Sequence, residues 1–157
     1  MTIALGSDPN ARELKNILIT FIEGLGHQTR DYGADDPIYA NVAFAVAEDV
    51  ARGVCDRGIL ICGTGIGVSI AANKVRGAHA ACVSDIYQAQ RAALSNDANI
   101  ITLGAQVTGP ELAKCLVEAY LSLRFDPNSR SSPKVDRIRQ YENAQPQTVI
   151  CRAAASI

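Results

Sequence analysis

Two hydrophobic periods alternate along this chain, one typical of buried strands and one typical of helices. After the first apolar run, six residues repeat at the spacing of one helix face before Gly26 ends the pattern: Leu14, Ile17, Leu18, Phe21, Ile22 and Leu25. The alternation predicts strands over residues 2–7, 27–32, 58–62, 78–83 and 100–103. It predicts helices over residues 14–25, 39–52, 65–74, 86–95 and 110–123. Strands separated by helices need crossover connections, so we expect an α/β fold with a five-stranded parallel sheet covered on both faces.

The pattern changes after Phe125. Residues 126–133 are polar and loop-like, and residues 134–143 predict a charged helix with few apolar positions. A helix with so little to bury is expected to pack on a partner or at the edge of the domain. We expect one domain over residues 1–143 and a C-terminal tail over residues 144–157.

The composition is that of a globular protein and excludes several classes of partner. The chain has 157 residues, of which 48% are hydrophobic and 20% charged, and its formal net charge is −1. Because it has no basic run, we do not expect nucleic acid as its main partner. No apolar stretch approaches the roughly 20 residues of a membrane span, and the first residues lack the features of a signal peptide. We therefore expect a cytoplasmic protein without a membrane partner. Five cysteines without a CxxC pair argue against a disulfide framework or a metal site.

Functional groups are expected at one edge of the predicted sheet, because parallel sheets bind ligands outside the carboxyl ends of their strands. This edge would hold Ser7-Asp8, Cys62–Gly67, Ser84-Asp85 and Gly104–Gly109. The densest pattern among them is ICGTGIGVS, Ile61–Ser69, at a predicted strand-to-helix junction. Its glycines let the backbone approach a ligand, and amide groups at a helix start favour negative charge. The same field would stabilise a Cys62 thiolate, and a basic sulfur beside amide donors suits abstraction of a carbon-bound proton.

Other interpretations of this loop remain open at this stage. In a dinucleotide fingerprint, G-x-G-x-x-G, Gly63 and Gly65 fit, but Val68 stands in the third place. Asp85 lies about as far along the chain from the glycines as the ribose-binding acid of such a fingerprint, so the dinucleotide interpretation remains open. A Walker loop is excluded because no Gly-Lys-Ser/Thr follows. The loop could also be a tight turn whose cysteine is merely buried.

The loop, with its continuation through Asn73-Lys74, resembles the signature of the type B ribose-5-phosphate isomerases, a family that includes the galactose-6-phosphate isomerase subunits. The resemblance extends from residue 1 to about residue 141, and its other motifs follow in order: Gly6-Ser7-Asp8, Asp36-Pro37-Ile38-Tyr39, Asn96-Asp97-Ala98-Asn99 and the segment from Arg130 to Lys134. It implies a Rossmann-like αβα sandwich that forms homodimers or homotetramers, with active sites and the C-terminal helix at the dimer interface. It also implies that no metal or organic cofactor is needed.

The resemblance assigns a role to each matching residue. Cys62 is implied to be the base that moves a proton between C1 and C2 of an open-chain sugar phosphate. Thr64 and the loop amides would stabilise the enediolate and hold the substrate; these loop positions are Gly63, Gly65, Ile66, Gly67 and Ser69. Asp8 matches a substrate-binding aspartate, and Asn96 an asparagine that reaches the substrate across the interface. Arg130 and Lys134 match two phosphate-binding residues, with one inserted residue and Lys in place of Arg.

A structural role competes with each of these assignments. Asp8 could cap a helix N-terminus, and Asn96 could end a helix. Arg130 and Lys134 could belong to a solvated charged face. Tyr39 also matches a position near the family's pocket, but we expect it to be a core aromatic at a helix start.

The resemblance implies an aldose–ketose isomerase of a small phosphorylated sugar, and three departures bear on which sugar. Pro9 and Ser95 stand where the family usually has histidines, and Gln106 where many members have a phosphate-binding arginine. The histidine replaced by Ser95 is implicated in opening the sugar ring. A tetrose 4-phosphate needs no such step, because the oxygen that would close a five-membered ring carries the phosphate.

We therefore expect conversion of D-erythrulose 4-phosphate to D-erythrose 4-phosphate, and residues 91–96 are similar to the branch with that activity. Ribose 5-phosphate and ribulose 5-phosphate are the alternative substrate pair. A non-catalytic phosphate- or nucleotide-binding module, or a partner subunit, is the alternative from another class.

Overall fold

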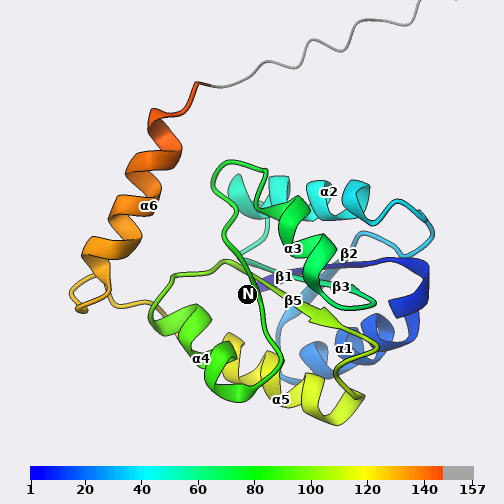
Figure 1. Cartoon of the computed structure of the whole chain (residues 1–157). Coiled ribbons are helices and arrows are strands. Elements are labelled where there is room, and N and C mark those ends of the chain that lie inside the picture. Colours follow the sequence, from blue (N-terminus) through cyan, green and yellow to red (C-terminus); the bar gives the residue numbers. More distant parts are fainter. Residues whose placement is uncertain (147–157) are drawn as a thin grey trace, which may run out of the picture.

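The computed structural model describes residues 1–146 and has the parallel five-stranded sheet that the sequence predicts (Figure 1). The strands are β1 (Thr2–Ser7), β2 (Gln28–Asp31), β3 (Arg57–Cys62), β4 (Ala80–Cys82) and β5 (Ile100–Gly104), in the spatial order β2-β1-β3-β5-β4. The helices are α1 (Arg12–Gly24), α2 (Tyr39–Ala51), α3 (Ile66–Ala72), α4 (Ile86–Leu94), α5 (Pro110–Leu121) and α6 (Ser132–Ala144), and a short 3-10 turn, η1 (Pro9–Ala11), precedes α1. Every pairing is parallel, so all five strands end at the same edge of the sheet.

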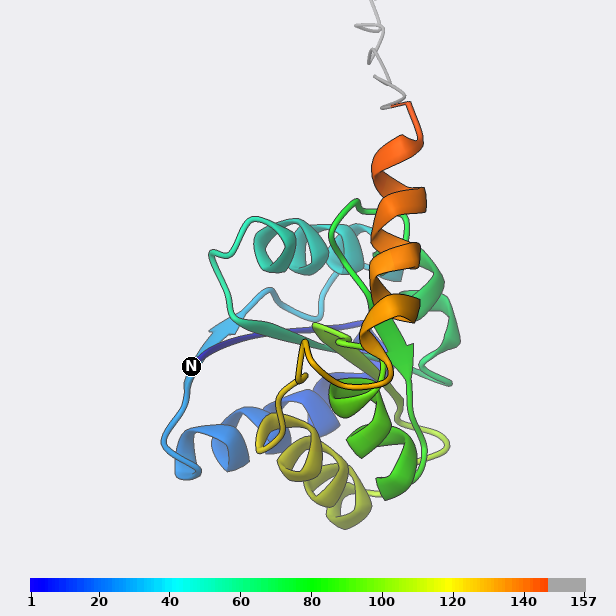
Figure 2. The same cartoon turned by 90° about the vertical axis from the view of Figure 1, so that its left-hand side faces the viewer.

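Helices cover both faces of the sheet, as expected for crossover connections. α1, α4 and α5 lie on one face, and α2 and α3 lie on the other (Figures 1 and 2). The central strand β3 feeds both layers, because successive side chains alternate between the faces. Ile59 and Ile61 pack with the first layer, while Leu60 and Cys62 pack with the second. Burial of each such aliphatic side chain stabilises the fold by about 1.5–3 kcal/mol.

A buried arginine holds the C-terminal end of α5 against the start of β3. The Arg57 guanidinium lies 4.4 Å from the centroid of the Tyr120 ring. It donates hydrogen bonds to the backbone carbonyls of Tyr120 and Leu123, the second at 2.7 Å. These carbonyls belong to the last turn of α5 and the residues after it, which have no partners within the helix. The Tyr120 hydroxyl donates to the Ala98 carbonyl at 2.8 Å, so the same cluster fixes the chain just before β5.

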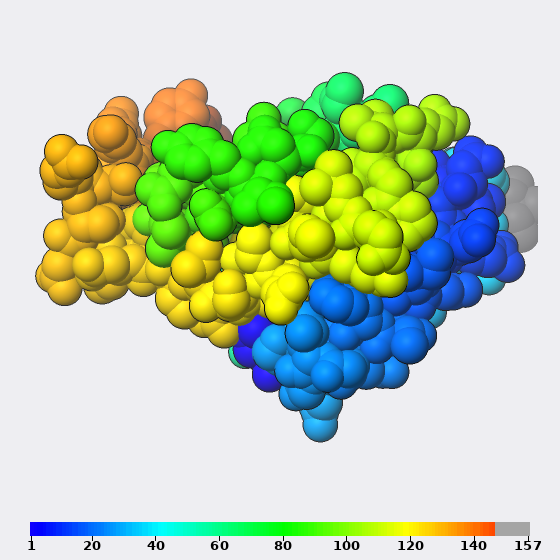
Figure 3. All heavy atoms as spheres, turned by 90° about the horizontal axis from the view of Figure 1, so that it is seen from below, coloured from blue at the N-terminus to red at the C-terminus, as the bar shows by residue number. Residues whose placement is uncertain are grey.

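α6 lies apart from the layers around the sheet. It stands beside the body in Figure 1, lies in front of it in Figure 2, and forms the orange left-hand end of the surface in Figure 3. Val135 is the one buried residue of this helix. The expected charged helix is thus present, and it begins two residues before the predicted start. Its last residue is Ala144, and residues 147–157 of the predicted tail lie outside the described part of the chain.

Candidate active site

Cys62 ends the central strand and opens the glycine-rich loop. Its side chain is 5% exposed, and its Sγ accepts a hydrogen bond from the backbone N–H of Gly65 at 3.2 Å. Gly65 has φ of +80°, a left-handed conformation that glycine adopts without strain. The Gly65 carbonyl accepts a hydrogen bond from the Thr102 hydroxyl of β5 at 2.7 Å. The loop therefore turns back on the sulfur, and the neighbouring strand holds it in that position.

A second turn, between β5 and α5, is joined to this loop along the backbone. The Ala105 N–H donates to the Cys62 carbonyl at 2.8 Å, and the Gln106 N–H donates to the Gly63 carbonyl at 3.0 Å. Gly104 makes this approach possible, because a Cβ at that position would lie 2.6 Å from the carbonyl carbon of Thr64. The Gln106 side chain lies over Gly63, with its amide carbon 3.4 Å from where a Cβ of Gly63 would be. The two turns thus form one rigid rim at the carboxyl edge.

The hydroxyl of Thr64 is exposed on this rim. Its Oγ1 accepts the Ile66 N–H at 3.3 Å, which leaves the hydroxyl proton free to donate outward. Gly67 follows at the second position of α3, where an amide has no partner within the helix. Ser69 is turned the other way, since its Oγ donates to the Ala80 carbonyl at 3.4 Å. Thr64 and the amide of Gly67 are therefore available to an oxyanion, whereas the Ser69 side chain ties α3 to β4.

Tyr39 lies on this rim and is not the core aromatic that we expect from the sequence. It is 41% exposed at the start of α2. A Cβ on Gly67 would lie 2.6 Å from Cζ of the Tyr39 ring, so the ring is in close contact with the first turn of α3. The expectation of a buried side chain was wrong because the first turn of α2 extends past the core to the carboxyl edge. The contact between this glycine and an aromatic residue of another helix depends on tertiary packing, which the local sequence pattern does not predict.

Asp8 follows β1 and lies beside the end of β3. Its backbone N–H donates to the Ile61 carbonyl at 3.1 Å, and the residue is 9% exposed. Its Oδ1 accepts the Ala11 N–H at 3.1 Å and so caps η1, with Pro9 as the first residue of that turn. This cap engages one carboxylate oxygen, and a carboxylate has two. The capping role expected as an alternative is present, and it does not prevent a second role.

The remaining predicted site residues lie at the opposite edge of the sheet. Asn96 precedes β5, so it lies at the amino edge, where it lines a hollow of about 250 Å³ with Asn73 and with Val135 and Ile138 of α6. Lys134 is exposed in the first turn of α6, and Arg130 is exposed just before that helix. A single chain therefore brings Cys62, Thr64 and Asp8 together but leaves Asn96, Arg130 and Lys134 on the far side.

Ser95, which replaces one of the family histidines, and both histidines of the chain lie away from the carboxyl edge. Ser95 ends α4, where its Oγ is 3.4 Å from Nη1 of Arg91. His79 precedes β4 at the amino edge, and its Nε2 lies 3.5 Å from a carboxylate oxygen of Glu142 in α6. His27 precedes β2, and partial burial lowers its pKa. Neither histidine lies at the carboxyl edge that holds Cys62.

The dinucleotide interpretation gains nothing from the structure. Asp85, its candidate ribose ligand, is the N-cap of α4 and accepts the Gln88 N–H at 2.8 Å. No group of three or more His, Cys, Asp or Glu side chains within residues 1–146 is arranged to hold a metal ion. Within the same residues, no helix is both long enough and apolar enough to cross a membrane.

Comparison with known proteins places these features in a family. A family model described as Ribose/Galactose Isomerase matches residues 3–138. The D-erythrulose-4-phosphate isomerase of Pectobacterium atrosepticum is 45% identical over 149 residues, which is 92% of this chain and 97% of that protein. The D-erythrulose-4-phosphate isomerase 2 of Mycolicibacterium smegmatis is 54% identical over 113 residues, 71% of this chain and 74% of that protein. The solved structure of Clostridium thermocellum ribose-5-phosphate isomerase B superposes with a TM-score of 0.86 at 40% identity, covering 91% of this chain and 98% of that one.

Proposed function

The chain belongs to the ribose/galactose isomerase family as a sugar-phosphate isomerase, and on that premise we propose that it interconverts D-erythrulose 4-phosphate and D-erythrose 4-phosphate. The observation that carries the choice of sugar is the absence of a histidine where the family opens a ring. Ser95 stands at that position and lies within hydrogen-bond distance of Arg91. Two relatives named for the tetrulose phosphate, at 45% and 54% identity, support the same substrate.

The proposed reaction uses Cys62 as the proton carrier. The thiolate removes a proton from C1 of the ketose, and the electrons shift to the C2 oxygen to give the enediolate. The protonated sulfur then returns the proton to C2, while the proton of the C1 hydroxyl passes to the C2 oxygen and C1 becomes the aldehyde carbon of the aldose. The negative charge that develops on oxygen is met by the Thr64 hydroxyl and the amide of Gly67, which the loop holds in place before the reaction. Asp8, beside the end of β3, binds a substrate hydroxyl with its free carboxylate oxygen. The remaining loop positions, Gly63, Gly65 and Ile66, surround the reacting carbons.

We further propose that a second copy of the chain completes each site. Cys62 and Lys134 lie at opposite edges of the same sheet, so one chain cannot apply both to a four-carbon substrate. In a symmetric dimer, Asn96, Arg130 and Lys134 of the partner copy would reach the hydroxyls and the phosphate. The side of α6 that carries Lys134 suits such a contact, because Ile138 and Tyr141 on that side are 53% and 61% exposed.

The substrate is tested by comparing kcat/KM on two sugars with the purified protein. We expect the value for D-erythrulose 4-phosphate to exceed that for ribose 5-phosphate by about tenfold or more, a barrier difference of about 1.4 kcal/mol. A Ser95→His variant should gain activity on ribose 5-phosphate, and Ser95→Ala is its matched control. Equal or better efficiency of the unaltered protein on ribose 5-phosphate would assign it to the alternative substrate.

A second assay separates an enzyme from a binding module. In deuterated water, an isomerase that uses an exchangeable thiol introduces deuterium at the carbon that receives the proton. A chain that only binds phosphate, or a non-catalytic partner subunit, leaves the sugar unlabelled.

A further inference from the structure

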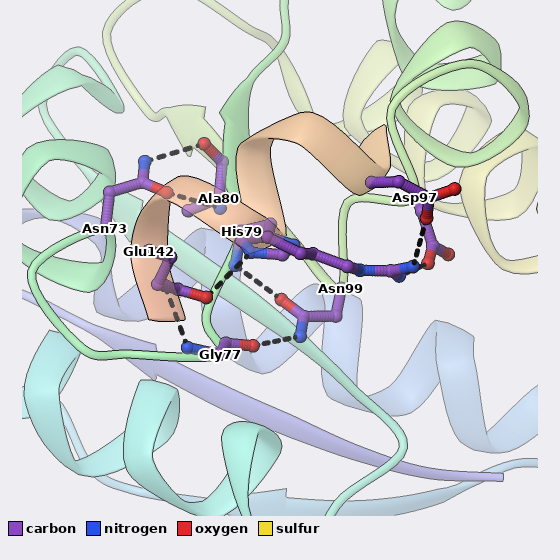
Figure 4. A network of polar contacts seen from close by, with 9 residues as sticks. Asn73, Gly77, His79, Ala80, Asp97, Asn99 and Glu142 are labelled. Carbon is purple, nitrogen blue, oxygen red and sulfur yellow. Dashed lines mark hydrogen bonds and ion pairs between the residues drawn. The ribbon is translucent and has the colours of Figure 1, made fainter. Parts of the chain in front are cut away.

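α6 is attached to the body by a small set of polar contacts at the amino edge of the sheet, and these contacts determine which way its side chains point. Figure 4 shows the set: Glu142 of α6 faces Gly77 and His79, and Asn99 connects the backbone around those two residues. Glu142 Oε1 accepts the Gly77 N–H at 3.0 Å, and its Oε2 lies 3.5 Å from His79 Nε2. One helical turn earlier, the Arg139 guanidinium forms an ion pair with the Asp97 carboxylate.

Asp97 combines an unusual backbone conformation with this ion pair. Its φ is +48°, and it is the one non-glycine residue within residues 1–146 with a positive φ. Aspartate tolerates this region better than most residues, but glycine would adopt it without strain. An aspartate here supplies a carboxylate, and that carboxylate is the anchor for Arg139. The pair is partly shielded, with the two side chains 42% and 35% exposed.

The helical period shows which side chains of α6 are oriented by the Arg139–Asp97 ion pair. Val135, Arg139 and Glu142 are spaced i, i+4 and i+7, so they lie on one face, and this face meets the body. Lys134, Ile138 and Tyr141 have the same spacing one residue earlier and form a separate stripe of exposed side chains. Lys134 is five residues from Arg139, about 140° around the helix axis. Fixing Arg139 on Asp97 therefore turns Lys134 away from its own body.

Asp97 also follows Asn96 directly, and the turn that holds both is fixed at the end of α4. The Asn96 N–H donates to the Arg91 carbonyl at 3.2 Å, and the Ala98 N–H to the Ala92 carbonyl at 2.8 Å. The Arg139–Asp97 pair thus connects the two elements that carry Asn96 and Lys134. Both elements, under the proposed function, serve the Cys62 loop of a second copy.

We infer that Arg139 and Asp97 are a positioning pair that sets the rotation of α6, and with it the direction in which Lys134 and the segment before it meet the phosphate of a substrate bound to a second copy. This inference rests on the proposed function. Neither residue touches the substrate. Their effect reaches the reaction through the phosphate-binding segment, so it falls on phosphate recognition and leaves the Cys62 loop unchanged.

The test compares Arg139→Gln and Asp97→Asn with the double variant, with Arg139→Lys as the conservative replacement and Lys114→Gln as control. Lys114 forms an exposed ion pair with Glu111 at 2.7 Å in α5, so its loss removes an ion pair without touching α6. We expect each single variant to raise KM for the sugar phosphate by roughly tenfold, since small misplacements of binding groups have effects of this size or larger. The double variant should be no worse than the worse single one, Arg139→Lys should recover most of the loss, and Lys114→Gln should resemble the unaltered protein.

A second measurement does not depend on turnover. Inorganic phosphate should slow the alkylation of Cys62 by iodoacetamide in the unaltered protein and lose this effect in Arg139→Gln, while the alkylation rate without phosphate stays the same. If the protein isomerises no sugar, but phosphate protects Cys62 in the unaltered protein and not in Arg139→Gln, the role of the positioning pair is supported and the proposed function is wrong. Unchanged KM and unchanged protection in both single variants would overturn the pair. Additive losses in the double variant would overturn it too.

Discussion

The sulfur of Cys62 accepts the Gly65 N–H, and Gly65, whose φ is +80°, then leads the chain into α3. The local sequence contains every part of this arrangement. That is why the cysteine and its glycines were predictable as a unit without knowledge of the fold.

Cys62→Ala should remove the base and leave the loop in place. We expect turnover to fall about 10²–10⁴-fold, the usual contribution of a positioned base. The thermal midpoint should change little, because glycines and backbone bonds define the loop. Cys115→Ala, which removes an exposed thiol from α5, is the matched control. Steady-state kinetics with D-erythrulose 4-phosphate measures the turnover of both variants. A Cys62→Ala turnover within a few-fold of the unaltered protein would exclude Cys62 as the base.

Gly104→Ala should damage the site from the neighbouring turn. Its Cβ would meet the Thr64 backbone at 2.6 Å, and backbone cannot move aside as a flexible side chain can. We expect a loss of about 1–3 kcal/mol in the free energy of unfolding, typical of overpacking, together with a lower kcat. Gly109→Ala has open space around its Cβ and should change neither quantity. Chemical denaturation of both variants measures the difference, and equal stability would show that the two turns are less closely joined than the structure indicates.

At the scale of elements, the sequence predicts every strand and helix of the sheet and its layers, with ends displaced by at most two residues. One displacement of two residues is at α3, which is expected to reach residue 74 but ends at Ala72. There the Asn73 side chain bonds the Ser69 and Ala80 carbonyls and closes the helix onto β4, which is a tertiary effect. The contact between Tyr39 and Gly67 was beyond prediction for the same reason. Each partner belongs to a different element, and only packing brings them together.

The edge strand β2 has an acid-sensitive attachment to α2. The Tyr32 hydroxyl donates to Asp49, and both Arg52 and Arg30 form ion pairs with the same carboxylate. The hydrogen bond from Tyr32, and after it the one from Arg52, lower the pKa of Asp49 below its usual 3.8. A carboxyl whose pKa is lowered in the folded state stabilises the fold above its unfolded pKa. That contribution is lost as the pH falls through the lowered value.

Asp49→Asn should therefore reduce stability at neutral pH and lose this effect in acid. We expect the difference in unfolding free energy between the variant and the unaltered protein to be constant above about pH 5 and to shrink below about pH 4. Urea unfolding over a pH series measures it. Glu118→Gln removes an exposed carboxylate that forms no ion pair within residues 1–146, and it reports the effect of charge removal alone. A difference that stays constant down to pH 2 would show that the Asp49 charge contributes nothing.

At the scale of the whole molecule, the order of the strands places the predicted site residues in two groups. The sequence could indicate which residues are candidates for binding the substrate, but the distance between the two groups follows from the sheet. Asn96 precedes a strand and Asp8 follows one, so a parallel sheet separates them by the length of its strands. Residue spacing alone cannot show whether the second group serves its own chain or another.

Mixing two inactive variants tests the shared site. Cys62→Ala and the double variant Arg130→Ala/Lys134→Ala should each have little activity, the first through kcat and the second mainly through KM. If each site takes one group from each copy, exchange of subunits restores about a quarter of the sites, because half of the dimers are mixed and each of those has one intact site. Activity is measured after the variants are mixed under mild denaturation and refolded together. A mixture no more active than the average of its components would place each site within a single chain.

The placement of Cys62 and α6 at opposite edges of one sheet also shapes how this gene could diverge after duplication. Under the proposed shared site, each copy has two separable functions, to supply the base and to supply the phosphate-binding residues. One duplicate could lose its cysteine and the other its basic segment, and the mixed pair would still keep one working centre. Selection would then maintain both genes, because neither product could act by itself. Two duplicated genes could therefore come to encode complementary subunits through two losses of function, one in each gene, and no new chemistry would be needed.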